Sequence, residues 1–383
     1  MDDADIAVVG LGAWGSCALW TLARRGVRVV GIERFDPGHS MGSSGGTSRM
    51  FRTACLEHPG LVPLARRSLE LWHELQAAAG EPLIDASGGL LIGPPDRHII
   101  AGTLAASRQH DLPVQVWDAG ELRNRMPVHA GLPDHHIGLW EQGAGLIRPE
   151  RSIAAAVRLA EAAGARVHTG TKVTGIELVS GGAVVSTPVR DLRVRQVVVA
   201  AGGWLGSLVD GLPVETVRMP MTWFAPPADP ERFALERLPV FMREMDDGVC
   251  VWGHGILPWS GPHDGLVKLG LEDSDGRFPV IDPERFDRSV SPADWDLLVD
   301  RLGTAVPGVG ALPASVSVCM YTRTPDNQFL LGRPRRDPRL VIAGGCNNHG
   351  FKHATGVGEA VADLVMGRSP ACDLGFCDPD RFG

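Results

Sequence analysis

The spacing of apolar residues changes twice within the first 33 positions of the chain. Residues 6–10 form a continuous apolar run, residues 16–25 carry apolar side chains at helical spacing, and residues 27–33 form a second run. Short continuous runs are typical of strands buried on both faces of a parallel sheet, and an amphipathic segment between them is typical of a crossover helix. The pattern therefore predicts a β-α-β unit at the start of the chain.

The same pattern predicts more elements further along. We expect helices at residues 61–78, 98–109, 153–163 and 356–366, and strands at 88–92, 165–168, 172–178, 183–186, 197–200 and 340–343. Segments that suit one sheet recur near the start, the middle and the end of the chain, whereas residues 215–317 carry more proline, tryptophan and short strands. We expect an α/β protein whose nucleotide-binding sheet is interrupted by a second domain, assembled from residues 85–147 and 215–317.

A glycine motif, Gly10-Leu-Gly-Ala-Trp-Gly15, occupies the first turn of the predicted β-α-β unit. Gly10, Gly12 and Gly15 allow a tight turn, close approach of a pyrophosphate, and close packing of helix on strand. Glu33 ends the second strand, where a carboxylate can accept hydrogen bonds from an adenosine ribose. The arrangement predicts a bound dinucleotide without separating FAD from NAD. Glu33 argues against NADP, although Arg34 directly after it points the other way.

The overall composition narrows the function. The chain has 383 residues, of which 44% are hydrophobic and 21% charged, and its formal net charge is −8. This is enough apolar material for a folded core, and the negative charge argues against nucleic acid or an anionic membrane surface as the main partner. No uncharged apolar run reaches about 18 residues, so no transmembrane helix is expected. The first four residues show no basic signal-peptide region.

The seven cysteines are scattered along the chain without a C-x-x-C pair. This spacing argues against a disulfide framework or a structural zinc site, so we expect no metal and take a reducing cytoplasm as the default location. The sequence signatures of zinc hydrolases, serine hydrolases and kinases are also absent.

Basic residues are strongly biased towards arginine. Of 37 basic residues, three are lysines: Lys172, Lys268 and Lys352. Each of them is a candidate for chemistry that arginine does not perform, because arginine stays charged and carries a rigid fork. Chance survival is the alternative for any one lysine taken alone.

Residues 43–52 combine a glycine- and serine-rich turn, which starts at Ser43, with two arginines three positions apart. If Arg49 and Arg52 lie on one helical turn, they share a face. Fixed positive charge on that face suits a substrate carboxylate or an anionic cofactor ring. Phosphate binding or a surface helix would give the same pattern.

Three later segments carry further candidate residues. Lys268 lies in a strand-like apolar segment, from which its side chain could enter a cavity, and an exposed lysine on an edge strand is the alternative. Cys319 and Tyr321, the one tyrosine of the chain, share a face if the segment is extended, although a buried structural cysteine has the same pattern. His349 follows the last predicted strand, and taken alone we expect it to be structural.

Together these segments resemble the monomeric sarcosine oxidase and N-methyltryptophan oxidase group of FAD-dependent amine oxidases. The resemblance covers residues 6–367 and is carried by residues 10–15 with Glu33, Phe35-Asp-Pro37, Gly46-Thr-Ser-Arg-Met-Phe-Arg52, residues 266–270, Val318-Cys-Met-Tyr-Thr-Arg-Thr-Pro-Asp326 and residues 343–352. It implies a Rossmann-like FAD-binding domain of residues 1–84, 148–214 and 318–383. This domain would be interleaved with an α+β substrate domain of residues 85–147 and 215–317, built on a mainly antiparallel sheet.

The resemblance also implies how FAD is held. Gly10, Gly12, Gly15 and Glu33 would bind its ADP part. Further positions implied to contact the cofactor are Arg34, Ser43, Arg49, Val173, Gly202, Gly344, Gly350 and Lys352. Cys319 would carry the flavin covalently, as a thioether to the 8α-methyl carbon, which requires a positioned cysteine that can lose its proton.

The catalytic groups are implied in the same way. Lys268 would lie over the flavin and activate O2, since an ammonium group stabilises the superoxide-like charge formed in the first electron transfer. Arg49 would set the charge near the flavin, and Arg52 and Lys352 would bind the substrate carboxylate. Tyr321 would belong to the same active site.

The part of the site that would receive the substrate side chain departs from the family pattern. Where relatives that act on sarcosine have a histidine, this chain has Glu272, which could accept a hydrogen bond from a substrate hydroxyl or ammonium group, or pair with Arg277 outside the pocket. An active-site tyrosine of the family also has no tyrosine counterpart, and Trp252 or His254 could replace it. These changes favour an amino-acid-like substrate other than sarcosine.

Our leading interpretation is an FAD-dependent oxidase of a secondary or cyclic amino acid, either an N-methyl amino acid or a ring of the pipecolate or piperideine-carboxylate type. It would form an imine and H2O2, with O2 as acceptor. One alternative is a dehydrogenase with another acceptor, which Lys268 disfavours. The other is a non-catalytic FAD-binding subunit, which Cys319, Arg52 and Lys352 disfavour. We expect a monomer or a small homo-oligomer.

Overall fold

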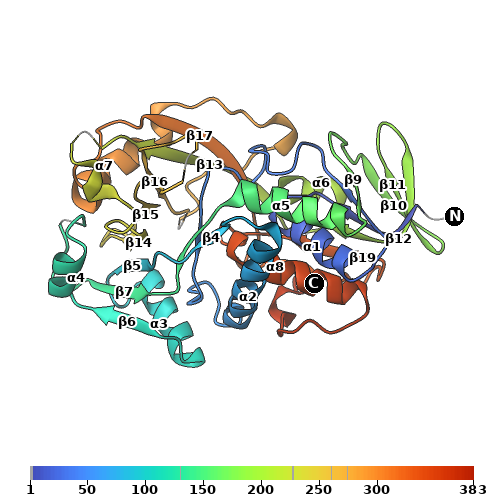
Figure 1. Cartoon of the computed structure of the whole chain (residues 1–383), viewed down its shortest axis with the longest axis horizontal. Helices are drawn as coiled ribbons and strands as arrows, with labels where there is room; N and C mark the ends of the chain where they lie inside the picture. The colour runs from blue at the N-terminus through green and yellow to red at the C-terminus, as the bar shows by residue number, and fades with distance from the viewer. Residues whose placement is uncertain (1–2, 130, 227, 260, 274) are drawn as a thin grey trace.

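The computed structural model describes residues 3–129, 131–226, 228–259, 261–273 and 275–383. Two large sheets lie towards opposite ends of an elongated molecule. A third, small sheet has three strands, which come from chain segments that connect strands of the two large sheets. Both chain termini lie in the right-hand half of Figure 1, together with the sheet that contains the first strand.

The first sheet has the topology of a nucleotide-binding domain. Its strands follow the order β10 (Gly175–Val179), β11 (Gly182–Ser186), β12 (Asp191–Val199), β1 (Ala4–Val9), β2 (Val29–Ile32) and β9 (Arg166–His168), and β19 (Leu340–Gly344) and β18 (Leu330–Gly332) extend it beside β12. The pairs β12–β1, β1–β2, β2–β9 and β12–β19 are parallel, whereas β10, β11 and β18 are antiparallel to their neighbours. Start, middle and end of the chain thus meet in one sheet, which confirms the interleaving expected from the sequence.

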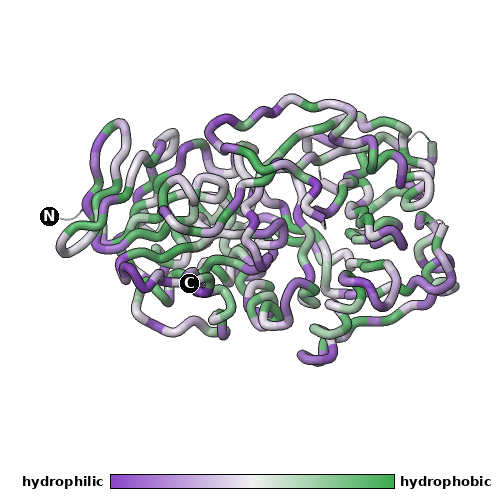
Figure 2. The backbone as a smooth tube through the Cα atoms, turned by 180° about the vertical axis from the view of Figure 1, so that it is seen from behind, coloured by the Kyte–Doolittle hydropathy of each residue, from purple (hydrophilic) through white to green (hydrophobic). Residues whose placement is uncertain are grey.

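Four helices pack together beside this sheet: α1 (Ala13–Arg24), α2 (Leu61–Ala79), α5 (Pro149–Ala162) and α8 (Ala354–Val365). Their apolar faces share one core with residues of β1, and α1 and α8 are buried over most of their length. A Cβ at Gly358 would lie 2.5 Å from the backbone of Cys17, so glycine is what lets α8 approach α1 so closely. Figure 2, which shows the chain from behind, has hydrophobic stretches in this half and in the other half of the molecule, each interrupted by hydrophilic ones.

The second sheet is mainly antiparallel, as expected. Its order is β17 (Ser315–Arg323), β13 (Glu215–Phe224), β16 (Val267–Leu271), β15 (Cys250–His254), β14 (Val240–Glu244), β5 (Gly89–Gly93), β7 (Ile137–Glu141) and β6 (Val114–Trp117). Only β14 and β5 pair in parallel among these described strands. The helices of this half are α3 (His98–His110), α4 (Ala119–Arg125) and α7 (Asp296–Ala305).

The expected boundary at residue 318 falls inside β17, whose residues pair with β13 from end to end. Cys319 and Tyr321 therefore belong to the second sheet and not to the nucleotide-binding sheet. The division of the whole chain into two domains stays a prediction.

Arg49 and Arg52 do not lie on one helical turn, so the condition under which they would share a helical face is not met. Arg49 lies in a strand, β3 (Arg49–Phe51), which pairs with β8 (Gly145–Ile147), and β8 also pairs with β4 (Ile84–Asp85). Arg52 follows directly after β3. The ladder with β8 satisfies the backbone groups of this segment, and a three-residue strand leaves no periodic signal in the sequence.

Short elements complete the described chain. They are α6 (Leu205–Leu208) and the 3-10 turns η1 (Gly202–Trp204), η2 (Pro230–Phe233), η3 (Pro283–Arg285), η4 (Pro292–Asp294), η5 (Phe351–His353) and η6 (Gly375–Cys377). Within the described residues, no helix has both the length and the apolar character that crossing a membrane requires.

Candidate active site

A cavity of about 880 Å³ connects the two large sheets. Its lining includes Gly10 and Gly202, which follow β1 and β12, and Lys268 and Cys319, which lie on β16 and β17. A cavity that starts at the carboxyl ends of parallel strands and continues to a second sheet suits an extended cofactor with a substrate at its far end.

The turn after β1 is shaped for a phosphate group. Gly10 has a φ of +85°, and a Cβ at Gly15 would lie 1.8 Å from the carbonyl oxygen of Gly10, so strand and helix touch without room for a side chain. A Cβ at Gly12 would meet only Ser44 Oγ, at 4.0 Å, and Gly12 lines the cavity. Gly10 and Gly15 therefore form the turn, and Gly12 keeps space open before the N-terminus of α1, where free N–H groups attract anions.

Glu33 lies at the end of β2 with both carboxylate oxygens engaged. The backbone N–H of Leu11 donates to Oε2 at 2.7 Å and that of Phe35 donates to Oε1 at 3.0 Å, while His39 Nε2 lies 3.3 Å from Oε1. Burial alone would raise the pKa of Glu33, but these hydrogen bonds lower it below its ordinary value. Glu33 thus stays ionised beside the cavity, as a ribose-binding carboxylate must.

The other predicted cofactor positions line the same cavity: Arg34, Ser43, Val173, Gly202, Gly344 and Gly350. The guanidinium of Arg34 already has other partners, since it pairs with Glu284 at 2.9 Å and lies over the Trp204 ring. Ser43 contributes its carbonyl oxygen, which accepts from Arg49 Nη2 at 2.7 Å. The structure therefore brings the predicted cofactor residues together, and their contacts with FAD stay predictions.

The glycine- and serine-rich loop before β3 is tied down by two charged side chains. Arg49 donates to the carbonyl oxygens of Ser43, Gly45 and Ser48, and Glu150 Oε1 accepts the N–H groups of Gly46 and Thr47 at 2.8 and 3.0 Å. The loop therefore holds Arg49 at the cavity wall instead of leaving it on a mobile surface segment.

Lys268 is 2% exposed and projects from β16 onto this loop. Its ammonium nitrogen donates to Gly46 O at 2.6 Å and lies 5.3 and 5.9 Å from the ring centres of Trp223 and Trp252. Burial, reinforced by the charge of Arg49, holds the pKa of Lys268 well below its ordinary value. The edge-strand alternative is therefore wrong for Lys268, since β16 pairs on both sides, with β13 and β15.

Cys319 lies at the centre of β17, 6% exposed and part of the cavity lining. Burial raises the pKa of its thiol, while the nearby charges of Arg49 and Lys268 oppose that shift. The thiol is unpaired. A cysteine that feels the charge of two cations at a ligand cavity is suited to chemistry that a cysteine buried in an apolar core does not perform.

Two cations and one carboxylate meet at another part of the cavity wall. Glu57 Oε1 lies 2.6 Å from Arg52 Nη2 and 2.9 Å from Lys352 Nζ, and the side chains of all three are at most 12% exposed. Burial alone would raise the pKa of Glu57, but Arg52 and Lys352 hold it well below its ordinary value. The cluster carries one net positive charge, and Glu57 Oε2 has no hydrogen-bond partner among the described residues.

Glu272 also lines the cavity, just beyond β16. It accepts a hydrogen bond from Asn348 Nδ2 at 3.1 Å, and burial raises its pKa to about 7. Arg277 pairs with Asp275 at 2.7 Å, so the alternative in which it pairs with Glu272 is not the arrangement found.

Tyr321 lines the cavity, but its hydroxyl donates to Asp273 Oδ2, which also lies 3.1 Å from Arg323. Burial and this carboxylate raise the pKa of Tyr321. The hydroxyl is therefore protonated and committed to Asp273, which favours an orienting role over proton transfer for Tyr321.

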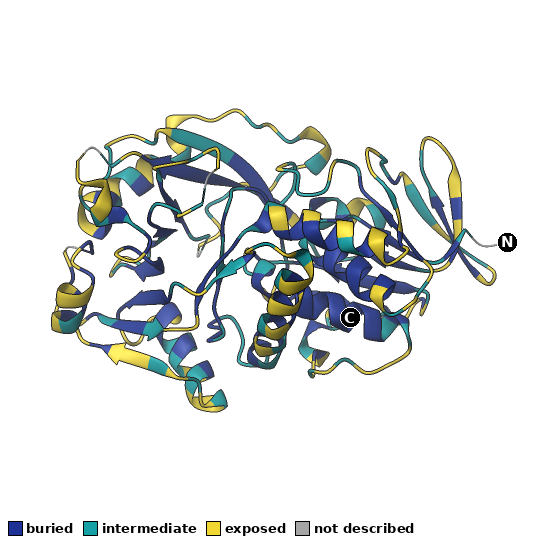
Figure 3. Cartoon of the chain, viewed as in Figure 1, coloured by how far each residue is buried: buried dark blue, intermediate teal, exposed yellow. Residues whose placement is uncertain are grey.

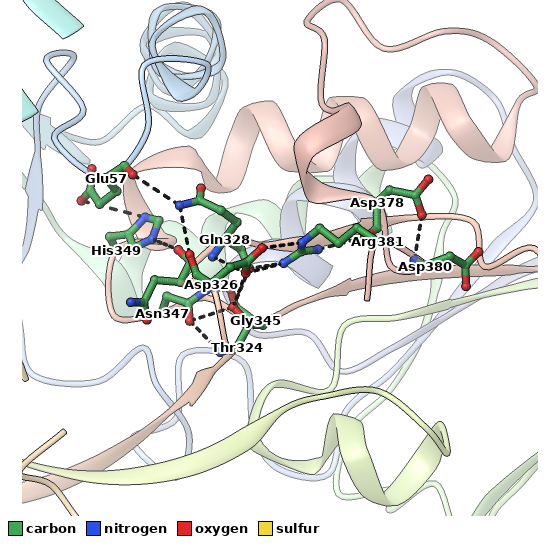
Figure 4. Close-up of polar contacts among 11 residues, drawn as sticks. Glu57, Thr324, Asp326, Gln328, Gly345, Asn347, His349, Asp378, Asp380 and Arg381 are labelled. Carbon is green, nitrogen blue, oxygen red and sulfur yellow. Dashed lines mark hydrogen bonds and ion pairs between the residues drawn. The ribbon is translucent and has the colours of Figure 1, made fainter. Parts of the chain in front are cut away.

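A polar network fixes the loop after β19 from behind (Figure 4). Asn347 Oδ1 accepts from the N–H of Thr324 at 2.8 Å, and the carboxylate of Asp326 binds both Arg381 Nε and Nη2, at 2.7 and 2.8 Å. Gln328 Nε2 donates to the carbonyl oxygen of Glu57 at 3.3 Å. Arg381 thus holds Asp326, which is linked through Thr324 to Asn347 in the loop that leads to Lys352.

The sequence patterns did not point to Glu57, Glu150, Ser48 or Asp273 as site residues. Ser48, Glu57 and Asp273 lie within five residues of predicted site residues, and this proximity was the available signal. His349, expected to be structural, lines the cavity with Nδ1 3.9 Å from Glu57, while its Nε2 is 3.3 Å from Asn327 O.

The comparisons with known proteins agree with this geometry. Residues 5–364 match the family model described as FAD dependent oxidoreductase. Monomeric sarcosine oxidase of Streptomyces avermitilis is 36% identical over 382 residues, which cover 99% of this chain and 97% of that protein. N-methyl-L-tryptophan oxidase of Citrobacter koseri is 32% identical over 379 residues, with 99% of each chain covered. This chain therefore belongs to the family of FAD-dependent oxidoreductases, and FAD is its cofactor.

Solved structures show the same fold. The open form of NikD, described as an unusual amino acid oxidase essential for nikkomycin biosynthesis, superimposes with a TM-score of 0.83 at 26% identity, covering 99% of this chain and 98% of that one. Glycine oxidase from Geobacillus kaustophilus superimposes with a TM-score of 0.80 at 24% identity, covering 100% and 99%. The family resemblance and the fold expected from the sequence are thus confirmed.

Proposed function

We propose that this protein is an oxidase that converts a secondary or cyclic amino acid into its imine and reduces O2 to H2O2. The observation that carries the proposal is the pairing of two sites within one cavity: Lys268 beside Cys319, and Arg52 beside Lys352. The relatives named for oxidation of sarcosine and N-methyl-L-tryptophan support the same reaction class. When bound, FAD would accept a hydride equivalent from the amine and pass the two electrons to O2.

Arg52 and Lys352 would bind the substrate carboxylate. Together with Glu57 they leave one positive charge, which a carboxylate would neutralise. Binding through both cations would orient the amine-bearing carbon along the cavity, and the walls of the cavity would exclude water from the reacting centre.

Lys268 would serve the oxygen half of the reaction. Reduction of O2 begins with formation of an anion, and a fixed ammonium group in a water-poor cavity stabilises that charge far more than water does. The cation–π contacts with Trp223 and Trp252 favour the charged form of Lys268 against its burial.

The rest of the pocket favours a substrate with more polar groups than sarcosine. Glu272 offers a carboxyl group, and Trp252 Nε1 is buried without a hydrogen-bond partner in the described part of the chain. A polar group left unpaired in a closed site costs free energy, so a substrate that pairs with Glu272 and Trp252 would bind more tightly than one that does not.

We also propose that Cys319 carries FAD through a thioether bond. The charges of Arg49 and Lys268 support this, because both cations favour the thiolate that such a bond requires. The first experiment is therefore acid precipitation of the wild-type protein and of Cys319→Ser. We expect the yellow flavin to stay with the precipitated wild-type protein. In the variant, the flavin should be released into the supernatant. Flavin that stays attached to the variant would show that another residue forms the bond.

The reaction class is tested by H2O2 release. N-methyl and cyclic amino acids should give stoichiometric H2O2 and O2 uptake, and the matched methyl esters, which lack the carboxylate, should be poor substrates. Reduction of the flavin by these amino acids without O2 uptake would contradict the oxidase and favour a dehydrogenase with another acceptor.

A further inference from the structure

Lys268 is the first of three side chains that are joined in series by hydrogen bonds, and Ser48 and His254 are the other two. Lys268 Nζ lies 3.3 Å from Ser48 Oγ, and Ser48 Oγ lies 2.7 Å from His254 Nε2. The other ring nitrogen, His254 Nδ1, lies 2.7 Å from the carbonyl oxygen of Gly255. His254 is 3% and Ser48 2% exposed, so protein atoms, and not bulk solvent, satisfy these groups.

The chemistry of the groups fixes the direction of every hydrogen bond. A carbonyl oxygen can only accept, so His254 Nδ1 carries the proton. Burial and the charge of Lys268 lower the pKa of His254 to about 3, so the ring is neutral and Nε2 is a bare acceptor. The one hydroxyl proton of Ser48 must therefore point to Nε2, and the lone pairs of Ser48 Oγ remain for an N–H of Lys268.

This direction gives each ammonium proton of Lys268 an acceptor. Gly46 O lies at 2.6 Å, Ser48 Oγ at 3.3 Å and Ser48 O at 3.4 Å from Nζ. A neutral amine has only two N–H bonds and would leave one of these acceptors unused. Without His254, the hydroxyl of Ser48 could rotate and donate to a neutral amine instead, which would stabilise the uncharged form of Lys268.

We propose that Ser48 and His254 are positioning residues that hold Lys268 as an ammonium ion inside the cavity. The inference rests on the proposed function, in which Lys268 serves O2 reduction, and adds how a buried lysine keeps its charge there. His254 acts through Ser48, because it locks the hydroxyl in the orientation that accepts from Lys268.

Other charged or titratable groups also face Lys268 and act alongside this hydrogen-bonded series. Arg49, from β3, opposes the ammonium, whereas Glu150, from α5, favours it. Cys319, from β17, would favour it only as a thiolate, a charge that the proposed thioether bond removes. His263 stacks on Trp223 at 3.7 Å between ring centres, and no hydrogen bond joins it to Lys268 or Ser48 in the described structure. His263 is thus a matched control: a second histidine near Lys268 that is outside the series.

The composition makes a direct test possible. Because the protein has three lysines, lysine labelled with ¹³C at Cε gives three side-chain signals, and Lys268→Met identifies the one from Lys268. The chemical shift of Cε reports protonation of the amine. The measurement is the titration midpoint of Lys268 in the FAD-loaded wild type, His254→Phe, His254→Gln, Ser48→Ala and His263→Phe.

We expect the midpoint to fall by at least about one pH unit in His254→Phe and Ser48→Ala, a tenfold loss of preference for the ammonium form. Gln offers an acceptor near the place of Nε2, so His254→Gln should recover most of the shift, and His263→Phe should leave the midpoint unchanged. The double variant of Ser48 and His254 should be no worse than Ser48→Ala, because the two act in series.

A Lys268 signal that follows the wild-type curve in both His254→Phe and Ser48→Ala would overturn the proposal, as would an equal shift in His263→Phe. Ser48→Ala removes a single oxygen atom and provides the answer if the larger change at His254 prevents folding. The proposed function fails separately: it fails if Lys268→Met reacts with O2 as fast as the wild type, whatever the midpoints are.

Discussion

Replacing Glu57 with glutamine should strengthen the binding of small carboxylates and weaken the fold. Glu57 lies 2.6 Å from Arg52 and 2.9 Å from Lys352, and cancels one of the two positive charges that we propose bind the substrate carboxylate. Glutamine keeps the size of the side chain and one accepting oxygen but removes the charge. The net charge of the cluster then rises from one to two positive charges.

The size of the effect follows from Coulomb's law. A carboxylate that contacts both cations would lie roughly 6 Å from Glu57, and at an effective dielectric constant of about 20 their repulsion is about 3 kcal/mol. Relaxation of the surrounding side chains offsets part of this repulsion, so we expect a gain of about 1–2 kcal/mol, or roughly 5- to 30-fold in the dissociation constant. The fold loses an ion-pair partner for two buried cations, a cost of about 3 kcal/mol at most, because glutamine still accepts a hydrogen bond.

Acetate and acetamide are a suitable pair of probes, since both are small and only acetate is charged. Titration followed by the visible spectrum of the bound flavin should show tighter acetate binding in Glu57→Gln, with acetamide binding unchanged. Unchanged or weaker acetate binding in a variant with a normal flavin spectrum would refute the electrostatic argument and place the carboxylate elsewhere.

The pH dependence of stability provides a second readout for the same variant. The pKa of Glu57 is depressed in the folded protein, so its contribution is present above the pKa of the unfolded chain, about 4.3, and is lost as the pH falls below it. Between pH 5 and pH 3, the free energy of unfolding should therefore fall less in Glu57→Gln than in the wild type. Parallel curves would contradict the depressed pKa.

Three further variants test other parts of the site. Lys268→Met should slow reoxidation of the flavin by O2 about 10²–10³-fold while flavin reduction changes little, as stopped-flow absorbance would show, and equal effects on both steps would remove the oxygen role. Glu272→Gln should abolish a transition near pH 7 in the pH profile of kcat/KM. Burial raises the pKa of this carboxyl group to about 7, so the group is neutral below that pH and charged above it. A transition that persists in the variant would belong to another group. Gly46→Ala should destabilise the protein by about 1–3 kcal/mol, because Gly46 has a φ of +104°. It should also disturb Lys268, since a Cβ at this position would lie 3.1 Å from Lys268 Nζ. An unchanged unfolding curve would refute the predicted loss of stability.

The nucleotide-binding half could be predicted from the sequence because its determinants are local. β1, α1 and β2 are neighbours along the chain, and the apolar pattern and the three glycines report the same geometry. Lys268 could be recognised for another reason, because a lysine in a chain so rich in arginine is itself a signal of function. The structure places it on β16, where it lines the cavity.

The charge balance of the site could not be predicted, because it depends on contacts between distant segments. Glu57 faces Lys352 across 295 positions of sequence, and Glu150 reaches back to the loop at Gly46 from α5. The strand β3 escaped prediction since its partner β8 lies about a hundred residues away. Pairings of this kind leave no periodic signal near either residue.

Because the ion pair between Arg381 and Asp326 supports the site, the site is completed late during synthesis of the chain. The first strand leaves the ribosome early, but the parallel strand β19, the loop with Lys352 and Arg381, which holds Asp326, are synthesised much later. Since domains made during synthesis fold from the N-terminus onwards, the cavity of the nascent chain stays open until Lys352 and Arg381 have emerged. Loss of the Arg381 side chain would therefore disturb cofactor loading.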